Sequence, residues 1–157
     1  MINDYRIEKD RLPVVIVTAD GARMSGELFV QPYARFRMGP EEAPDIMNGG
    51  ESFFPFAMEG GETVLIAKDH VREVELAPTA AAPDDLDPAT GARRAMIEMT
   101  LVDGAVISGA VYLEVPFDRP RLLDFLNRFD RRFITLHDAG GTRLVNRRLI
   151  ERVRPLD

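Results

Sequence analysis

The side chains that most often carry catalysis are few in this sequence. It has two histidines, His70 and His137, and no cysteine. Ser25 and Ser108 each precede a glycine, but a serine nucleophile needs a base and an orienting group beside it. A metal site needs three or four ligands. The sequence therefore predicts no catalytic residues, no metal and no cofactor, and we expect a protein that is not an enzyme.

Arginine is the side chain with binding chemistry that is concentrated in one region. Residues 93–157 hold 12 basic side chains, all arginine, and nine acidic ones, whereas residues 1–78 hold eight basic and 14 acidic side chains. The planar arginine fork suits carboxylates and phosphates. These arginines could follow a phosphate backbone, with Phe129 or Phe133 stacking on bases. Interleaved acidic residues favour an ion-paired surface or a subunit contact instead.

One stretch of the chain occurs twice and organises the elements around it. Residues 20–30, DGARMSGELFV, return as residues 103–113, DGAVISGAVYL, with five of eleven positions identical. Asp-Gly tolerates the positive φ angles of a hairpin turn, so each copy reads as strand, tight turn, strand. Gly26 and Gly109, inside the second strand of each copy, indicate a bulge or sharp bend.

The rest of each half follows the same order. Apolar and alternating runs predict strands, with one helical turn between the second and third strand of each half. The predicted strands are residues 14–19, 24–31, 53–56, 63–67, 70–75, 95–102, 106–115, 133–136, 144–146 and 149–153, and the helical turns are 43–48 and 121–127. Such short, bent strands favour a mostly β fold of two small five-stranded barrels, 1–78 with an N-terminal arm and 93–157, joined by a linker at 79–92.

The most apolar short run is a candidate for assembly. Phe53, Phe54 and Phe56 lie in it, interrupted by Pro55. Proline cannot donate to a ladder, so Pro55 indicates an edge strand. An apolar edge strand is either covered within the molecule or used for assembly, and we favour assembly.

Composition sets the broad class. The chain has 157 residues, is 45% apolar and 29% charged, and carries a net charge of −6, which indicates a globular protein. No run of 18 apolar residues occurs, and the N-terminus has no apolar leader-like segment. We therefore expect a cytoplasmic protein without a membrane partner.

The pattern resembles the Sm-like fold, the small bent barrel of Sm and RNA-chaperone rings. The resemblance rests on three features of each half. They are the glycine inside the second strand of the hairpin, Gly26 or Gly109, the segment DIMN at 45–48 or DFLN at 124–127, and the strand-turn-strand block 65–74 or 144–153. Three features depart from it. The Asp and Asn are one residue closer together, the segment before them is longer and could be helical, and the Arg-Gly of the second block is replaced by residues 68–69 and 147–148. The chain also resembles an uncharacterised bacterial domain family, which supplies no activity.

The resemblance implies two tandem Sm-like or SH3-like barrels that associate edge to edge, with a ligand or RNA site at Asn48 and Asn127. The neighbouring Arg128, Arg147 and Arg148 complete that candidate site. Capping of each helical turn by its Asp and Asn is the alternative role, which we favour.

For function, we expect a non-enzymatic assembly or adaptor protein that acts through protein–protein contacts and self-associates as a ring or dimer. An RNA-binding Sm-like protein is the alternative.

Overall fold

The fold is mostly β. The computed structural model describes residues 10–34, 38–77, 93–113 and 122–156, and in these it has ten antiparallel strands and two α-helices. The chain divides into two compact units, Met1–Leu76 and Ala77–Asp157. The predicted linker at 79–92 and the first nine residues of the N-terminal arm lie outside the described residues. No helix among the described residues is long and apolar enough to cross a membrane.

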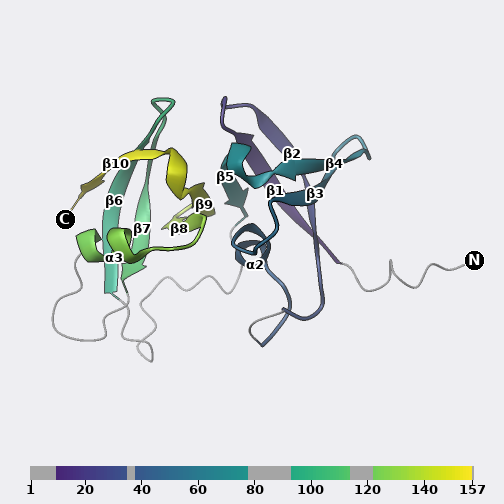
Figure 1. Ribbon diagram of the computed structural model, residues 1–157, viewed down its shortest axis with the longest axis horizontal. Coiled ribbons are helices and arrows are strands. Elements are labelled where there is room, and N and C mark those ends of the chain that lie inside the picture. The colour runs from purple at the N-terminus through teal and green to yellow at the C-terminus, as the bar shows by residue number, and fades with distance from the viewer. Residues whose placement is uncertain (1–9, 35–37, 78–92, 114–121, 157) are drawn as a thin grey trace, which may run out of the picture. The chain divides into compact units, whose positions relative to one another are not determined.

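Unit 1 contains five strands in the spatial order β5-β1-β2-β3-β4. The helix lies in the connection between the second and third strands, where the sequence predicts it (Figure 1). The elements are β1 (Asp10–Thr18), β2 (Arg23–Val30), α2 (Ala43–Met47), β3 (Phe53–Met58), β4 (Thr63–Ala67), the 3-10 turn η1 (Lys68–His70) and β5 (Val71–Leu76).

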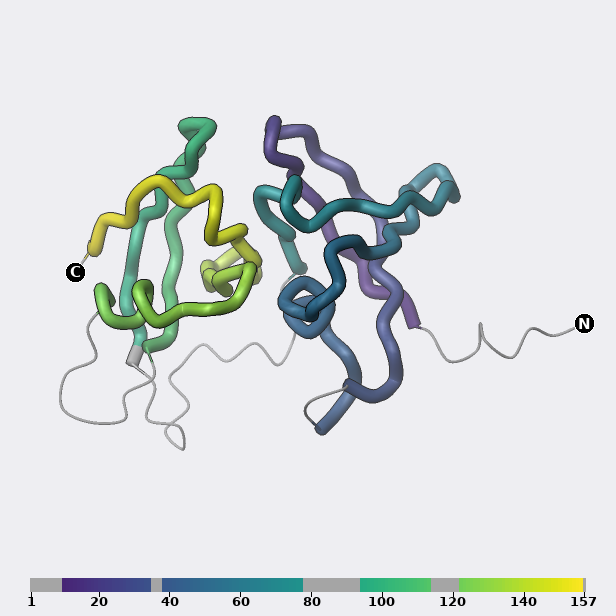
Figure 2. Tube along the Cα trace, in the orientation of Figure 1, coloured from purple at the N-terminus to yellow at the C-terminus, as the bar shows by residue number. Residues whose placement is uncertain are grey.

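Unit 2 has the corresponding order β10-β6-β7-β8-β9. Figure 2 shows its long β6–β7 hairpin in green, with β10 in yellow beside β6. The elements are β6 (Arg93–Leu101), β7 (Val106–Leu113), α3 (Leu122–Arg128), β8 (Phe133–Asp138), β9 (Gly141–Asn146), the 3-10 turn η2 (Arg147–Leu149) and β10 (Ile150–Pro155).

The strand order of each unit is open, so closed barrels are not present. Among the described residues, no pairing joins β4 to β5 or β9 to β10. The cause in unit 1 is local. The three-residue η1 redirects the chain after β4, and β5 pairs antiparallel with β1 instead of returning along β4.

The Asp-Gly hairpins form as predicted, with the same bonds in both units. In unit 1 the Thr18 N–H donates to the Ala22 carbonyl at 2.8 Å, and in unit 2 the Leu101 N–H donates to the Ala105 carbonyl at 2.8 Å. The turn glycines, Gly21 and Gly104, both have φ of 92°. That value is in the left-handed region, which glycine adopts without strain.

The register of the strands also corresponds between units. Val14 pairs with Gly26 in unit 1, and Ile97 pairs with Gly109 in unit 2, so both partners shift by 83 residues. Gly26 lies where β2 pairs with β3, opposite Met58, and a Cβ there would clash with the Ala57 carbonyl oxygen. The bend predicted from these glycines is therefore a close backbone approach.

Each unit has an apolar core on the inner face of its strands. In unit 1 the buried apolar residues are Val14, Ile16, Val17, Leu28, Val30, Ala43, Met47, Phe54, Phe56, Ala57, Val71 and Val74. In unit 2 the core cluster is Ile97, Met99, Leu101, Ile107, Val111, Leu113, Ile134, Leu136 and Val145. The apolar side of α3 packs against the second cluster.

Two prolines lie inside strands. Pro13 is the fourth residue of β1, which begins four residues before the strand predicted at 14–19, and pairing of β1 with β5 begins only at Val14. Pro55 is in β3, which lies between β2 and β4 and is not an edge. Pairing of β3 with β2 begins at Phe56, so the donor that Pro55 lacks falls where that ladder has already ended.

Candidate interaction surfaces

The predicted assembly residues divide between the two faces of β3. Phe54 is 2% exposed and Phe56 is fully buried, whereas Phe53 is 58% exposed. Successive strand residues point to opposite faces, so Phe54 and Phe56 point into the core while Phe53 and Pro55 point out. Phe54 and Phe56 are therefore corrected from assembly residues to core residues, and Phe53 remains accessible.

The outward face of β3 continues onto β4. Pro55 pairs with Leu65, and Phe53 pairs with Ala67, so these side chains share one face of the hairpin. Leu65 is 71% exposed. Phe53, Pro55 and Leu65 form what we call the β3–β4 apolar patch, and sequence reasoning did not include Leu65 in it.

The helix α2 holds Asn48 at its C-terminal end. The Asn48 N–H donates to the Pro44 carbonyl at 2.9 Å, as a C-cap residue does. At the other end, Asp45 Oδ2 accepts the Glu42 N–H at 2.8 Å and completes a capping box. Asp45 and Asn48 therefore both occupy capping positions of α2, which is the structural role that the sequence favours.

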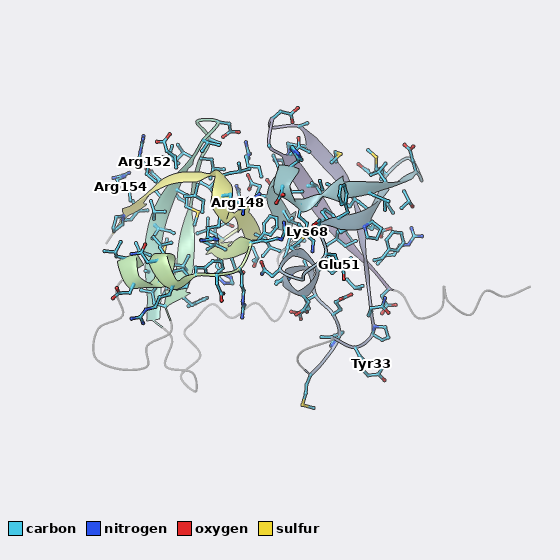
Figure 3. The ribbon with its side chains drawn as sticks, in the orientation of Figure 1. Tyr33, Glu51, Lys68, Arg148, Arg152 and Arg154 are labelled. Atoms are coloured by element: carbon cyan, nitrogen blue, oxygen red, sulfur yellow. The ribbon has the colours of Figure 1, made fainter. Side chains whose placement is uncertain are left out.

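Lys68 is the buried cation of unit 1, and sequence reasoning treated it as part of a polar turn. It is 1% exposed and lies beside α2 (Figure 3). Its Nζ donates to the Ile46 carbonyl at 2.6 Å and to the Gly49 carbonyl at 3.3 Å. These carbonyls terminate α2, where the negative end of the helix dipole favours a cation. Lys68 thus fastens α2 to the start of η1.

In unit 2 the predicted ligand residues lie on the solvent side of α3. Asn127 and Arg128 are both exposed, while Phe125 and Phe129 turn inward toward the core cluster, with ring centroids 5.7 Å apart. Phe133 is 1% exposed. The two phenylalanines that the sequence offers for base stacking are therefore core residues.

A backbone hydrogen bond brings the residues just before β8 close to η2. The Arg147 N–H donates to the Arg132 carbonyl at 2.9 Å, so Arg131 and Arg148, which flank this bond in sequence, lie near each other. Asn146 Oδ1 accepts the Arg148 N–H at 3.0 Å and fixes the turn. We call the exposed arginines beside this bond the arginine cluster, made of Arg131, Arg147 and Arg148.

The arginine cluster differs from the other arginines of unit 2 in its partners. Arg154 forms a two-bond ion pair with Glu98 at 3.2 and 3.0 Å, Arg152 pairs with Glu151, and Arg143 lies 3.5 Å from Asp138. In the part of the chain that the structure describes, no carboxylate pairs with the cluster side chains. Figure 3 labels Arg148 at η2, apart from Arg152 and Arg154 on β10.

Comparison of the chain with protein-family models, curated proteins and solved structures gave no match. The surfaces above are therefore interpreted from their own chemistry.

The remaining candidates for chemistry are the two serines and His137. Ser25 and Ser108 are exposed on β2 and β7. His137 is on β8 beside Tyr112, with ring centroids 4.8 Å apart, and burial lowers its pKa, as does the charge of Arg94. No group of three histidine or acidic side chains that could hold a metal occurs among the described residues. The accessible features are thus the β3–β4 apolar patch and the arginine cluster.

Proposed function

We propose that this protein is a non-enzymatic assembly or adaptor protein that acts through protein–protein contacts at the edge of unit 1. The proposal depends on one observation: β4 is the outermost strand of unit 1 and carries apolar side chains that are accessible. Leu65 on β4 is 71% exposed, and Phe53 on the neighbouring β3 is 58% exposed. All five residues of β4 are uncharged and none is proline. Natural edge strands are normally protected by charge or proline, so an unprotected apolar edge suits a contact.

The finer architecture is part of the same proposal. The two units are an internal duplication, each a small bent sheet of the Sm-like or SH3-like kind. Support comes from the common strand order, the common 83-residue register shift and the common hairpin bonds. A chain with two such units offers outer strands for self-association into a dimer or ring, or for a protein partner.

A Leu65→Lys variant tests the contact. Lysine at this exposed position leaves the core of unit 1 intact but puts a charge on the edge. In light scattering, we expect the mass of the wild type to rise with concentration and that of the variant to stay constant. Alternatively, we expect the wild type to capture a protein from a native extract that the variant does not capture. Leu123→Lys is the matched control, because Leu123 is a 65% exposed leucine on α3. If wild type and Leu65→Lys behave alike in both measurements, the proposed function is wrong.

RNA binding is the second candidate function, and the arginine cluster favours it. Exposed arginines without carboxylate partners are suited to phosphate contacts. The cluster lies at the same turn that the Sm-like resemblance assigns to RNA, although its arginines replace the Arg-Gly of that pattern. Phe133 is buried and Phe129 packs against the core cluster, so binding would rest on the backbone charge of the nucleic acid.

A further inference from the structure

The hydrogen bonds of the β3–β4 hairpin fix the direction of every peptide group in β4. The Met58 N–H donates to the Glu62 carbonyl at 2.8 Å, and the Lys68 N–H donates to the Ser52 carbonyl at 2.9 Å. Hydrogen-bonded and non-hydrogen-bonded pairs alternate along an antiparallel ladder. With the observed register, Val64 and Ile66 bond to β3, and the residues between them do not.

The outer edge of β4 therefore presents the peptide groups of Thr63, Leu65 and Ala67. Each directs one N–H and one C=O away from β3, and among the described residues none of these groups has a backbone partner. The same three side chains share the outward face with Phe53 and Pro55. One edge thus carries both open donors and acceptors and the β3–β4 apolar patch.

We propose that β4 pairs antiparallel with β4 of a second copy, in a two-fold register centred on Leu65. In this register Leu65 lies opposite Leu65 of the second copy, and Thr63 lies opposite Ala67. All three outward-directed residues of each strand then lie in hydrogen-bonded pairs. A register shifted by two residues would leave some of their peptide groups without a partner. This inference rests on the proposed assembly function and names its partner.

The side chains match in the same register. The Leu65 side chains of the two copies meet at the two-fold axis. On β3 of each copy, Pro55 lies beside Leu65 and Phe53 lies beside Ala67. Four adjacent strands then share one apolar face. Cross-strand apolar pairs of this kind stabilise a sheet.

The charges of the molecule favour β4 over the other outer strand as the partner. β10 carries exposed Arg152 and Arg154 and ends at Pro155, which lacks a donor. Pairing β4 with it would bring the Arg154–Glu98 ion pair against an apolar face and partly desolvate it. In the two-fold register the five residues of β4 that meet across the contact are all uncharged, so no ion pair is desolvated there.

The size of the contact predicts a weak dimer. A five-residue strand pair with one apolar patch is at the small end of specific interfaces, below about 1,200 Å² of total buried surface. A two-fold contact uses the same edge on both copies, so it closes at two chains. We expect mass to rise toward that of a dimer only over about 10 µM to about 1 mM protein.

The absence of cysteine makes the register directly testable by single-cysteine cross-linking. In a hydrogen-bonded antiparallel pair the Cα atoms are about 5.5 Å apart, within the range that a disulfide spans. Copper-phenanthroline oxidation should convert most of the Leu65→Cys variant to a covalent dimer. Thr63→Cys is the matched control, because its two copies would be about 14 Å apart along the ladder. The double variant Thr63→Cys/Ala67→Cys should cross-link again.

The outcomes separate the register from the function. A dimer from Leu65→Cys and from the double variant, without one from Thr63→Cys, supports the two-fold register. Equal cross-linking of both single variants would indicate random collision and overturn it. Suppose instead that Leu65→Cys gives no dimer, that the wild type is monomeric, and that the wild type captures a protein which Leu65→Lys does not. The register would then be overturned and the proposed adaptor function would stand.

Discussion

Lys68 is the first residue of the 3-10 turn η1 and Arg147 is the first residue of the corresponding turn η2, but their side chains have different surroundings. Each donates its backbone N–H to the residue just before the third strand of its unit, Ser52 in one case and Arg132 in the other, at 2.9 Å. Lys68 is 1% exposed and binds the carbonyls that end α2, whereas Arg147 is exposed. The same backbone position is thus structural in unit 1 and accessible for binding in unit 2.

Replacing Lys68 by methionine should destabilise unit 1. Methionine keeps the apolar stem but leaves the Ile46 and Gly49 carbonyls without the ammonium donor. We expect a loss of about 1–3 kcal/mol in the free energy of unfolding, measured by urea denaturation. Arg147→Met, at the corresponding exposed position, should change it by less than about 0.5 kcal/mol. Equal effects of the two substitutions would contradict the fastening role of Lys68.

Gly26→Ala should be one of the most damaging small substitutions in the chain. The added Cβ would clash with the Ala57 carbonyl oxygen and lie 2.6 Å from the Phe56 ring, so the paired strands β2 and β3 must move apart there. Overpacking of this kind costs about 1–3 kcal/mol or more. Gly60→Ala is the control, because a Cβ there meets nothing within 4 Å. Thermal unfolding should separate the two variants, and a Gly26→Ala protein as stable as wild type would refute the close approach.

The titration of His137 should make folding sensitive to mildly acid pH. Burial lowers the pKa of His137 below its ordinary 6.5, the charge of Arg94 lowers it further, and Asp138 opposes both. Below pH 6.5 the unfolded chain therefore binds a proton that the folded chain resists, so stability falls as pH drops through this window toward the folded pKa. His137→Gln should flatten this part of the stability profile. An unchanged slope in His137→Gln would exclude His137 as the cause.

Local sequence chemistry predicted the elements, because turns and strands depend on near neighbours. β4 was predicted with its observed bounds, residues 63–67, and each helix was predicted between the second and third strands. Gly26 was predicted to mark a bulge or bend, but the register of β1 and β2 is continuous there, and the glycine instead allows a close approach to the β3 backbone. Alternation in the run at 53–58 allows alternate side chains to be core, but Phe53, Phe54 and Phe56 were all predicted to be assembly residues, and burial removes Phe54 and Phe56 from that set.

Features that depend on tertiary contacts were not predictable in the same way. Lys68 is followed by Asp69 and His70, which indicates a polar turn, and only the position of α2 shows that its ammonium is buried. Pro55 indicated an edge strand, but the alternation of the ladder lets it sit opposite Leu65 in a central strand. Ion pairing separates Arg154 from the arginine cluster, and this depends on where Glu98 lies on the neighbouring strand.

Nucleic-acid binding, if the second candidate function holds, should depend on the arginine cluster and on salt. We expect a fluorescent single-stranded RNA of mixed sequence to bind at low salt and to be released as salt rises, because each phosphate contact releases counterions. Arg147→Gln/Arg148→Gln should weaken binding and reduce the slope of log affinity against log salt by about 1–2. Arg152→Gln is the control, because Arg152 is exposed but paired with Glu151. No binding at low salt, or equal binding by both variants, would remove the arginine cluster as a nucleic-acid site. The edge strand β4 would then be left as the functional surface.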